Sequence, residues 1–213
     1  MSVPLQYGLI QYIALLFALV VHESAHALSA HWMGDDTAKN LGRISMNPIV
    51  HMDIIGTVIF PMIMIFSGGA IPLFGWAKPV PVNPLNFHDR RKGVSLVSFA
   101  GPLSNIVLGI VFLLLFLLLR NVSTSTQIMV PILYILMYSV FINFILAVFN
   151  LIPVPPLDGS GVLFGLIPEQ TYLKYIEPIA PFGFIILFIL LYTGVLGFLF
   201  SPVLTILRMV MGV

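Results

Sequence analysis

Four apolar segments, each long enough to cross a lipid bilayer, most constrain how this chain can fold. They lie at about 5–30, 94–119, 128–150 and 176–200, and a helix needs roughly 20 apolar residues to span the hydrocarbon core. Of the 213 residues, 59% are hydrophobic and only 8% are charged, whereas about 25% are charged in soluble domains. The sequence therefore predicts an all-α polytopic membrane protein, with residues 1–213 forming a single integral membrane domain.

A fifth apolar stretch, residues 51–74, carries residues that break helices. Asp53, Pro61 and the glycine pair at 68–69 interrupt it, and a proline inside a helix removes a hydrogen bond and clashes with the preceding turn. We expect a broken helix, a re-entrant hairpin or a short β segment between the first two long helices. The expected total is then about five to six transmembrane segments, and whether 51–74 crosses the membrane stays open at this point.

Basic residues predict which side the connections face, because positively charged loops tend to stay in the cytoplasm. Lys39 and Arg43 lie in the first connection, and Arg-Arg-Lys at 90–92 lies at the end of the second. If both connections are cytoplasmic, residues 51–74 enter and leave the membrane on the same side. The helix that ends near Asn150 then returns to that side as well.

Charge and cysteine content narrow the partners and the ligands that the chain can use. Nine Lys and Arg against eight Asp and Glu leave a net charge of +1. No run of like charge indicates a charged tail, and nothing indicates nucleic acid as a partner. The chain has no cysteine, which excludes disulfides and thiolate metal sites. A metal ion would have to be held by His, Asp or Glu.

A His-Glu-x-x-His motif occupies residues 22–26, inside the first apolar segment. With about 3.6 residues per turn, His22 and His26 lie one turn apart on one helix face, so both imidazoles can bind one zinc ion. Glu23 then lies beside the metal, where it can take a proton from the attacking water and pass it to the leaving amine. Each such residue costs about 2.5–3.5 kcal/mol at the centre of a membrane helix, which argues for a function.

A third metal ligand has to come from elsewhere in the chain, because the motif supplies two histidines and catalytic zinc sites usually have three protein ligands. Asp158 follows the segment 151–157, whose three prolines cannot continue a helix. Irregular backbone is tolerated at membrane depth only where it lines a protein cavity. We therefore expect Asp158 to turn toward the metal, with Asp53 as the alternative third ligand.

These motifs resemble those of the site-2 protease family of intramembrane zinc metalloproteases. The resemblance rests on residues 22–26, on Ala-Gly-Pro-Leu-Ser-Asn at 100–105, and on 150–159, which is similar to the family's Asn-Pro-Asp-Gly segment. The connection at 75–83 looks like that of compact prokaryotic members without a PDZ domain. The motifs stand in the family's order and cover most of the chain.

The resemblance implies a role for each matching residue. His22, His26 and Asp158 match the ligands of one Zn²⁺ ion per chain, and Glu23 matches the catalytic glutamate. Asn150 matches an asparagine that holds the substrate strand or polarises its carbonyl.

Four further polar residues allow a structural interpretation. Asn105 either supports the site or only forms a hydrogen bond between helices, as polar residues in membrane interfaces do. His31, His51 and His88 lie in or beside connections. We expect the three histidines to be interfacial or structural, and their roles stay open.

By the same resemblance, the chain is expected to cleave peptide bonds within or near transmembrane segments of membrane proteins, as in regulated intramembrane proteolysis. Its partners would be a transmembrane protein substrate and the lipid bilayer. The expected location is the prokaryotic cytoplasmic (inner) membrane, with the active site toward the cytoplasm. An extended substrate would pair with an edge strand, for which 42–44 and 78–82 are the candidates. The physiological substrate, the cleavage position, the regulation and the oligomeric state stay open.

Two other classes of function remain at this point. A metal or ion transporter is one, because intramembrane histidines and carboxylates also mark ion pathways. A non-catalytic family member that binds transmembrane helices is the other. The clustering of the polar groups with protease spacing favours the protease.

Overall fold

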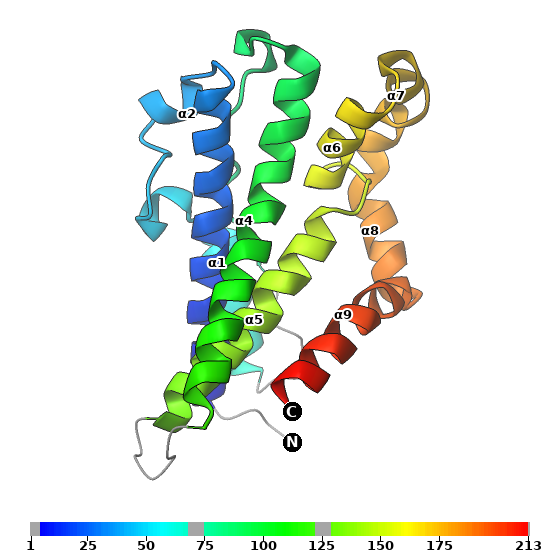
Figure 1. Ribbon diagram of the computed structural model, residues 1–213. Helices are drawn as coiled ribbons and strands as arrows, with labels where there is room; N and C mark the ends of the chain where they lie inside the picture. The colour runs from blue at the N-terminus through cyan, green and yellow to red at the C-terminus, as the bar shows by residue number, and fades with distance from the viewer. Residues whose placement is uncertain (1–4, 68–74, 122–128, 213) are drawn as a thin grey trace.

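The computed structural model describes residues 5–67, 75–121 and 129–212, and the regular elements in these ranges are all helical (Figure 1). The long helices are α1 (Leu5–Trp32), α4 (Arg90–Leu119) and α5 (Met129–Asn150). The shorter α-helices are α2 (Thr37–Asn40), α3 (Phe60–Phe66), α6 (Asp158–Leu166), α7 (Glu169–Tyr175), α8 (Gly183–Tyr192) and α9 (Val195–Met211). The 3₁₀-helices are η1 (Pro48–His51), η3 (Pro84–Asn86) and η4 (Glu177–Phe182), and η2 (Ile54–Ile59) is a π-helix.

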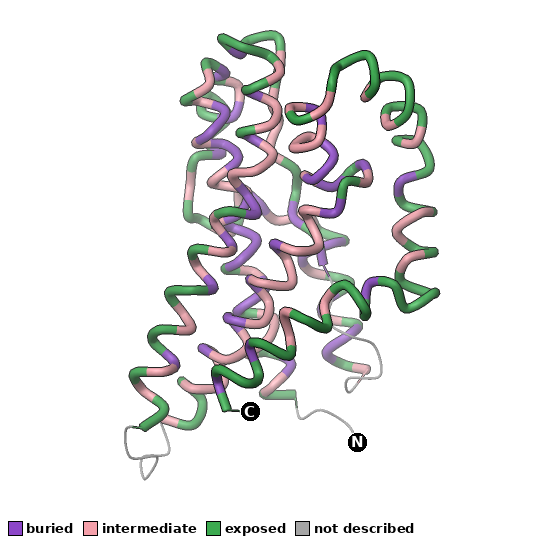
Figure 2. The backbone as a smooth tube through the Cα atoms, turned by 45° about the vertical axis from the view of Figure 1, so that its right-hand side comes forward, coloured by how far each residue is buried: buried purple, intermediate pink, exposed green. Residues whose placement is uncertain are grey.

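Helices α1, α4 and α5 run beside one another and form the centre of the molecule (Figure 1). Leu15 and Leu19 of α1 pack with Ile142 and Leu146 of α5. Exposed residues are spread along the helices (Figure 2). Many of them are large and apolar, for example Phe198, which is 81% exposed. Such outer surfaces would be unfavourable in water but suit contact with lipid.

The all-α membrane fold is confirmed by the helices that the structure describes. Four helical segments are long and apolar enough to cross a membrane, and two shorter ones are apolar as well: Leu5–Trp32, Arg90–Leu119, Met129–Asn150, Glu169–Tyr192, then Ile54–Phe66 and Val195–Met211. The first three spans lie close to the predicted segments.

The last predicted span, 176–200, differs from the structure. Helical structure already begins at Glu169, and α8 ends at Tyr192. Gly194 then turns the chain with φ +77°, in the left-handed region that favours glycine. The apolar composition continues through this turn and therefore does not mark it.

Helix α9 folds back after this turn against the central helices. Its residues Leu207 and Met211 join Phe116 of α4 and Val140 of α5 in one buried apolar cluster. The described part of the chain therefore ends against the central helices α4 and α5.

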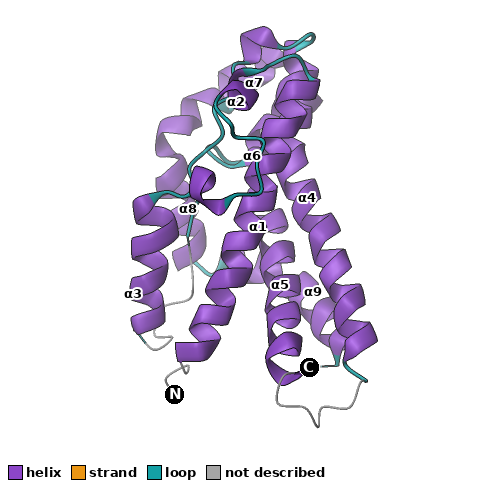
Figure 3. Cartoon of the chain, turned by 90° about the vertical axis from the view of Figure 1, so that its left-hand side faces the viewer, coloured by secondary structure: helices purple, strands orange, loops and turns teal. Residues whose placement is uncertain are grey.

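The residues that follow His51 lie beside the residues that lead up to Lys78. Helix α3 runs alongside α1 (Figure 3). The Lys78 N–H donates to His51 O at 2.8 Å, and the Trp76 N–H donates to Gly56 O at 3.2 Å. The two ends of the segment 51–78 therefore lie side by side, as expected for entry and exit on one side. The break predicted at the glycine pair 68–69 lies outside the described residues.

The short β segment among our alternatives is not found in the ranges 5–67 and 75–121, which include both candidate edges. Residues 78–82 have no regular secondary structure, and Pro79 and Pro81 have no N–H to donate to a ladder. The Lys78 and Val80 N–H groups donate instead to groups within the protein. The edge at 78–82 is thus poorly equipped to add a substrate strand.

One buried carboxylate, that of Asp35, joins the connection after α1 to the connection before α4. Asp35 is 0% exposed. Its oxygens accept hydrogen bonds from the Thr37 backbone and hydroxyl, from the Asn83 backbone and from the Asn86 side chain, at 2.5–3.1 Å. Burial disfavours the charged carboxylate, but these hydrogen bonds outweigh it and hold the pKa of Asp35 below its ordinary value.

Replacing Asp35 by Ala is expected to lower the free energy of unfolding by about 1.5–3 kcal/mol, because it leaves buried donors without an acceptor. Thermal unfolding in detergent at neutral pH measures the loss. Asp36→Ala is the control, since Asp36 is exposed and a change there should cost about 0.5 kcal/mol or less. Because the pKa is lowered in the folded state, the Asp35 contribution is present above the ordinary Asp pKa and is lost as the pH falls through the folded-state value.

Candidate metal centre

His22, His26 and Asp158 converge at the centre of the molecule. One possible ligand atom from each lies within 4.8 Å of the others. The two Nε2 atoms are 3.0 Å apart, and Asp158 places Oδ2 3.1 Å from His22 Nε2 and Oδ1 3.3 Å from His26 Nε2. Both histidines are buried, at 5% and 8% exposure. The two elements that supply these ligands, α1 and α6, are separated by more than half of the chain.

Asp158 reaches the histidines because helix α5 stops at Asn150. Residues 151–157 form turns, as their three prolines predict, and α6 then begins at Asp158 itself. Asp158 Oδ2 is buried without a hydrogen-bond donor among the described residues. A buried carboxylate oxygen of this kind is costly unless a cation compensates it.

The ring of His26 is held by the backbone of α4. Its Nδ1 lies 2.7 Å from Val97 O, and a carbonyl oxygen can only accept, so Nδ1 carries the proton. The lone pair of Nε2 is then free to bind a metal.

The ring of His22 is held by a chain of buried amides. Its Nδ1 lies 2.6 Å from Asn105 Oδ1. The Asn105 amide group donates to Ala18 O at 3.1 Å and to Asn143 Oδ1 at 2.9 Å, and Asn143 donates in turn to Ser139 O at 2.8 Å. Because these acceptors fix the orientation of the Asn105 amide, its oxygen faces His22 and Nδ1 is the donor. Asn105 therefore contacts the candidate ligand His22 as well as groups of two neighbouring helices.

Two imidazole lone pairs and a carboxylate, all directed at one another, repel unless a cation lies among them. The set of two nitrogens and one carboxylate oxygen is a usual one for catalytic zinc, which keeps a further position open for water or substrate. The ligand atoms present here thus fit a zinc ion.

Glu23 lies next to His22 in the sequence and is half-buried. Its Oε2 accepts a hydrogen bond of 3.1 Å from the Val80 backbone N–H. Val80 belongs to the connection that precedes α4, so this connection reaches the motif. Neither the spacing of the motif nor the composition of residues 75–83 indicated this contact.

Two further predicted residues, Asn150 and Asp53, form hydrogen bonds within their own helices. Asn150 ends α5, and its amide donates to Leu146 O in its own helix at 3.0 Å. Asp53, the alternative ligand, caps η2 by accepting from Ile55 N and Gly56 N. It does not belong to the metal-ligand group found among the described residues.

The three remaining histidines have local contacts. His31 pairs with Asp36 at 2.5 Å, and His88 Nδ1 donates to Met33 O at 2.7 Å. His51 is 1% exposed, and its Nε2 donates to Ser45 O at 2.8 Å. These contacts agree with structural roles for the histidines.

Asn143 was missed in the sequence, although a signal for it exists. It lies in a strongly apolar segment, seven residues before Asn150 and four after Ser139, which places all three on neighbouring parts of one helix face. A polar stripe on a membrane helix indicates a buried interface.

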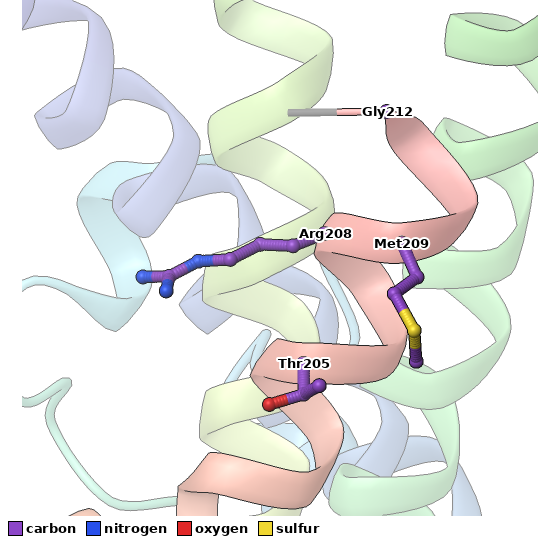
Figure 4. A pocket seen from close by; sticks show the side chains of 4 residues that line it. All are labelled: Thr205, Arg208, Met209 and Gly212. Carbon is purple, nitrogen blue, oxygen red and sulfur yellow. The ribbon is translucent and has the colours of Figure 1, made fainter.

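A separate pocket of about 420 Å³ lies on α9 and is lined by Thr205, Arg208, Met209 and Gly212 (Figure 4). These four residues include no histidine or carboxylate. The pocket therefore does not offer the ligands that zinc requires.

Gly101 leaves the space that the two histidine rings occupy. A Cβ at this position would lie 2.4 Å from His26 Nε2 and 2.6 Å from His22 Cε1. Gly101→Ala is therefore expected to displace the rings and to lower zinc affinity by about 10-fold or more. Metal analysis and competition with a chelator measure the loss. Gly197→Ala is the control, because nothing lies within 4 Å of a Cβ there; equal zinc affinity in both variants would contradict this steric account.

Comparison with known proteins identifies relatives over most of the chain. The model of "Peptidase family M50" matches residues 10–132 and 121–191. "Putative zinc metalloprotease YwhC" of Bacillus subtilis is 36% identical over 194 residues, which cover 90% of this chain and 84% of that protein. Rip2 of Mycolicibacterium smegmatis, which carries the same description, is 28% identical over 187 residues, or 85% of this chain and 66% of Rip2.

No solved structure matches the chain. The family model and the YwhC relationship each extend over far more than half of the sequence. Together with the His-His-Asp centre, they show that this is an integral membrane metalloprotease that uses zinc. The chain belongs to peptidase family M50, the site-2 protease family.

Proposed function

We propose that this chain cleaves peptide bonds within or near transmembrane segments of other membrane proteins. The observation that carries the proposal is the position of the His22–His26–Asp158 group, whose histidines lie within the span Leu5–Trp32. A protease centre at that position is accessible to a substrate segment inside the bilayer. A soluble polypeptide substrate would reach it less easily.

His22, His26 and Asp158 would hold the zinc ion through two Nε2 atoms and a carboxylate oxygen. Zinc, when bound, acts as a Lewis acid that polarises the scissile carbonyl and makes water a stronger nucleophile at neutral pH. Glu23 accepts the proton of the attacking water through the oxygen that Val80 does not occupy, and it delivers this proton to the leaving amine.

Asn150 is proposed to contact the substrate backbone. It lies at the point where α5 gives way to the turns before Asp158, so its amide is close in sequence to the ligand and half-buried. Rotation about its side-chain bonds would release it from Leu146 O and make the amide available to a substrate carbonyl.

The location and orientation are part of the same proposal. We place the protein in a prokaryotic cytoplasmic membrane, with the ends of α1 and α4 near Trp32 and Arg90 toward the cytoplasm. Lys39 lies in the connection after α1 and Lys92 in the first turn of α4, and positive charge near span ends favours the cytoplasmic side.

The test is cleavage in liposomes. Purified protein is mixed with a panel of tagged transmembrane segments and with soluble peptides of matched composition, and products are mapped by mass spectrometry. The proposal expects cuts within or next to the apolar stretch of at least one segment and their loss with a zinc chelator. Cleavage confined to the soluble peptides would contradict it.

A further inference from the structure

Arg43 is a buried cation whose hydrogen bonds, among the described residues, all go to backbone carbonyls. It is 6% exposed. Its Nη1 donates to Val50 O at 2.5 Å, and its Nη2 donates to Lys78 O at 2.5 Å and to Pro79 O at 3.0 Å. One guanidinium thus joins the connection after α2 to the connection before α4.

The segment 78–81, which Arg43 contacts, has few backbone donors for hydrogen bonds of its own. Pro79 and Pro81 have no N–H, so the only backbone donors of 78–81 belong to Lys78 and Val80. Lys78 donates to His51 O at 2.8 Å. Arg43 takes the carbonyls of Lys78 and Pro79, which fixes the chain immediately before Val80.

Val80 is the residue whose N–H reaches Glu23. The hydrogen bond to Glu23 Oε2 measures 3.1 Å. A glutamate side chain has three rotatable bonds, and a donor fixed on one oxygen restricts them and leaves the other oxygen for a proton. The path from Arg43 to Glu23 therefore consists of two consecutive peptide units.

We propose that Arg43 is a positioning residue for Glu23: it fixes the Lys78–Pro79 backbone so that the Val80 N–H orients the carboxylate. The inference rests on the proposed role of Glu23 as general base. Arginine suits the task because its planar group presents several donors in fixed directions, whereas the single ammonium of lysine cannot reach carbonyls of two segments with the same geometry.

The first test measures amide hydrogen exchange in the full-length protein in lipid nanodiscs. A peptide covering 77–82 is informative, because Pro79 and Pro81 contribute no amide. Arg43→Lys and Arg43→Gln are expected to speed exchange at Lys78 and Val80 by about tenfold or more. Arg120→Lys is the matched control, since Arg120 also donates to backbone carbonyls, those of Val210 and Met211 on α9, and it should leave 77–82 unchanged. Unchanged exchange in both Arg43 variants would overturn the inference.

The second test separates kcat from KM on a cleaved transmembrane segment. Misplacement of a catalytic group by about 1 Å can cost on the order of 100-fold, so Arg43→Lys is expected to lower kcat by about 10- to 100-fold, with KM and zinc content unchanged. Val80→Pro removes the N–H directly and should lower kcat similarly. Both changes remove the same orientation of Glu23. The kcat of the double variant should therefore be no lower than that of the slower single variant.

Two results would contradict this account. Additive losses in the double variant would mean that Arg43 and Val80 act independently. Loss of zinc together with kcat in Arg43→Lys would assign Arg43 to the fold and not to Glu23. The exchange measurement needs no substrate, so a wild type that cleaves nothing would count against the proposed function, while the exchange rates would still decide the inference about Arg43.

Discussion

Glu23→Gln is expected to lower cleavage by about 10²–10⁴-fold, the usual contribution of a general acid–base group, while the zinc content stays at the wild-type level. Glutamine keeps the length of the side chain and can still accept the hydrogen bond from Val80. It cannot accept the proton of water, so only the chemical step should fail. Zinc analysis and product formation, measured on the same preparation in liposomes, test this expectation.

A control variant separates the chemistry of Glu23 from disturbance of α1. Ser24→Ala changes the next residue. The Ser24 hydroxyl donates to Ser45 O at a distance of 2.6 Å and does not belong to the ligand group. The variant should keep zinc and most of the activity. Wild-type cleavage by Glu23→Gln would show that another group is the base, and loss of zinc in that variant would show that Glu23 also supports the metal.

Asp158→Ala is expected to remove most of the zinc. Loss of an outer partner of a metal ligand already costs about 10–100-fold in affinity, and loss of the ligand itself should cost more. The change also removes the carboxylate that lies 3.1 and 3.3 Å from the two histidine nitrogens, which are themselves 3.0 Å apart. Cleavage should fall in proportion to the zinc that is lost, and metal analysis after dialysis measures it.

Asp53→Ala is the matched control for this experiment, because Asp53 was the alternative ligand and caps η2 instead. It should keep a full zinc complement. If Asp158→Ala kept its zinc and Asp53→Ala lost it, the assignment of the third ligand would be reversed.

The parts of the fold that follow from composition could be predicted. The three central spans have long apolar sequences, and the turns at 151–157 follow from prolines, so both are local properties of the chain. The break at Gly194 was missed because the residues on either side are equally apolar. Entry and exit of residues 51–74 on one side was inferred from loop charge, and the hydrogen bond between Lys78 and His51 agrees with it.

The candidate site divides in the same way. The spacing of His22 and His26 specifies one helix face, and the prolines before Asp158 indicate where a carboxylate is free to turn. The supports of these residues could not be read from spacing, because Val97 O, the Val80 N–H and the Arg43 guanidinium reach the site only through contacts between distant parts of the chain. Such contacts depend on packing, which no local pattern encodes.

The origin of the three ligands in α1 and α6 has a consequence for the lifetime of the protein. An ion bound only by the native arrangement adds RT ln(1 + [Zn]/Kd) to the free energy of unfolding, which is about 2.7 kcal/mol at a hundredfold excess over Kd. The zinc ion is then a removable cross-link between the beginning of the chain and a segment beyond its third span. A cell short of zinc would hold not only less active enzyme but a looser one, which quality-control proteases would clear faster.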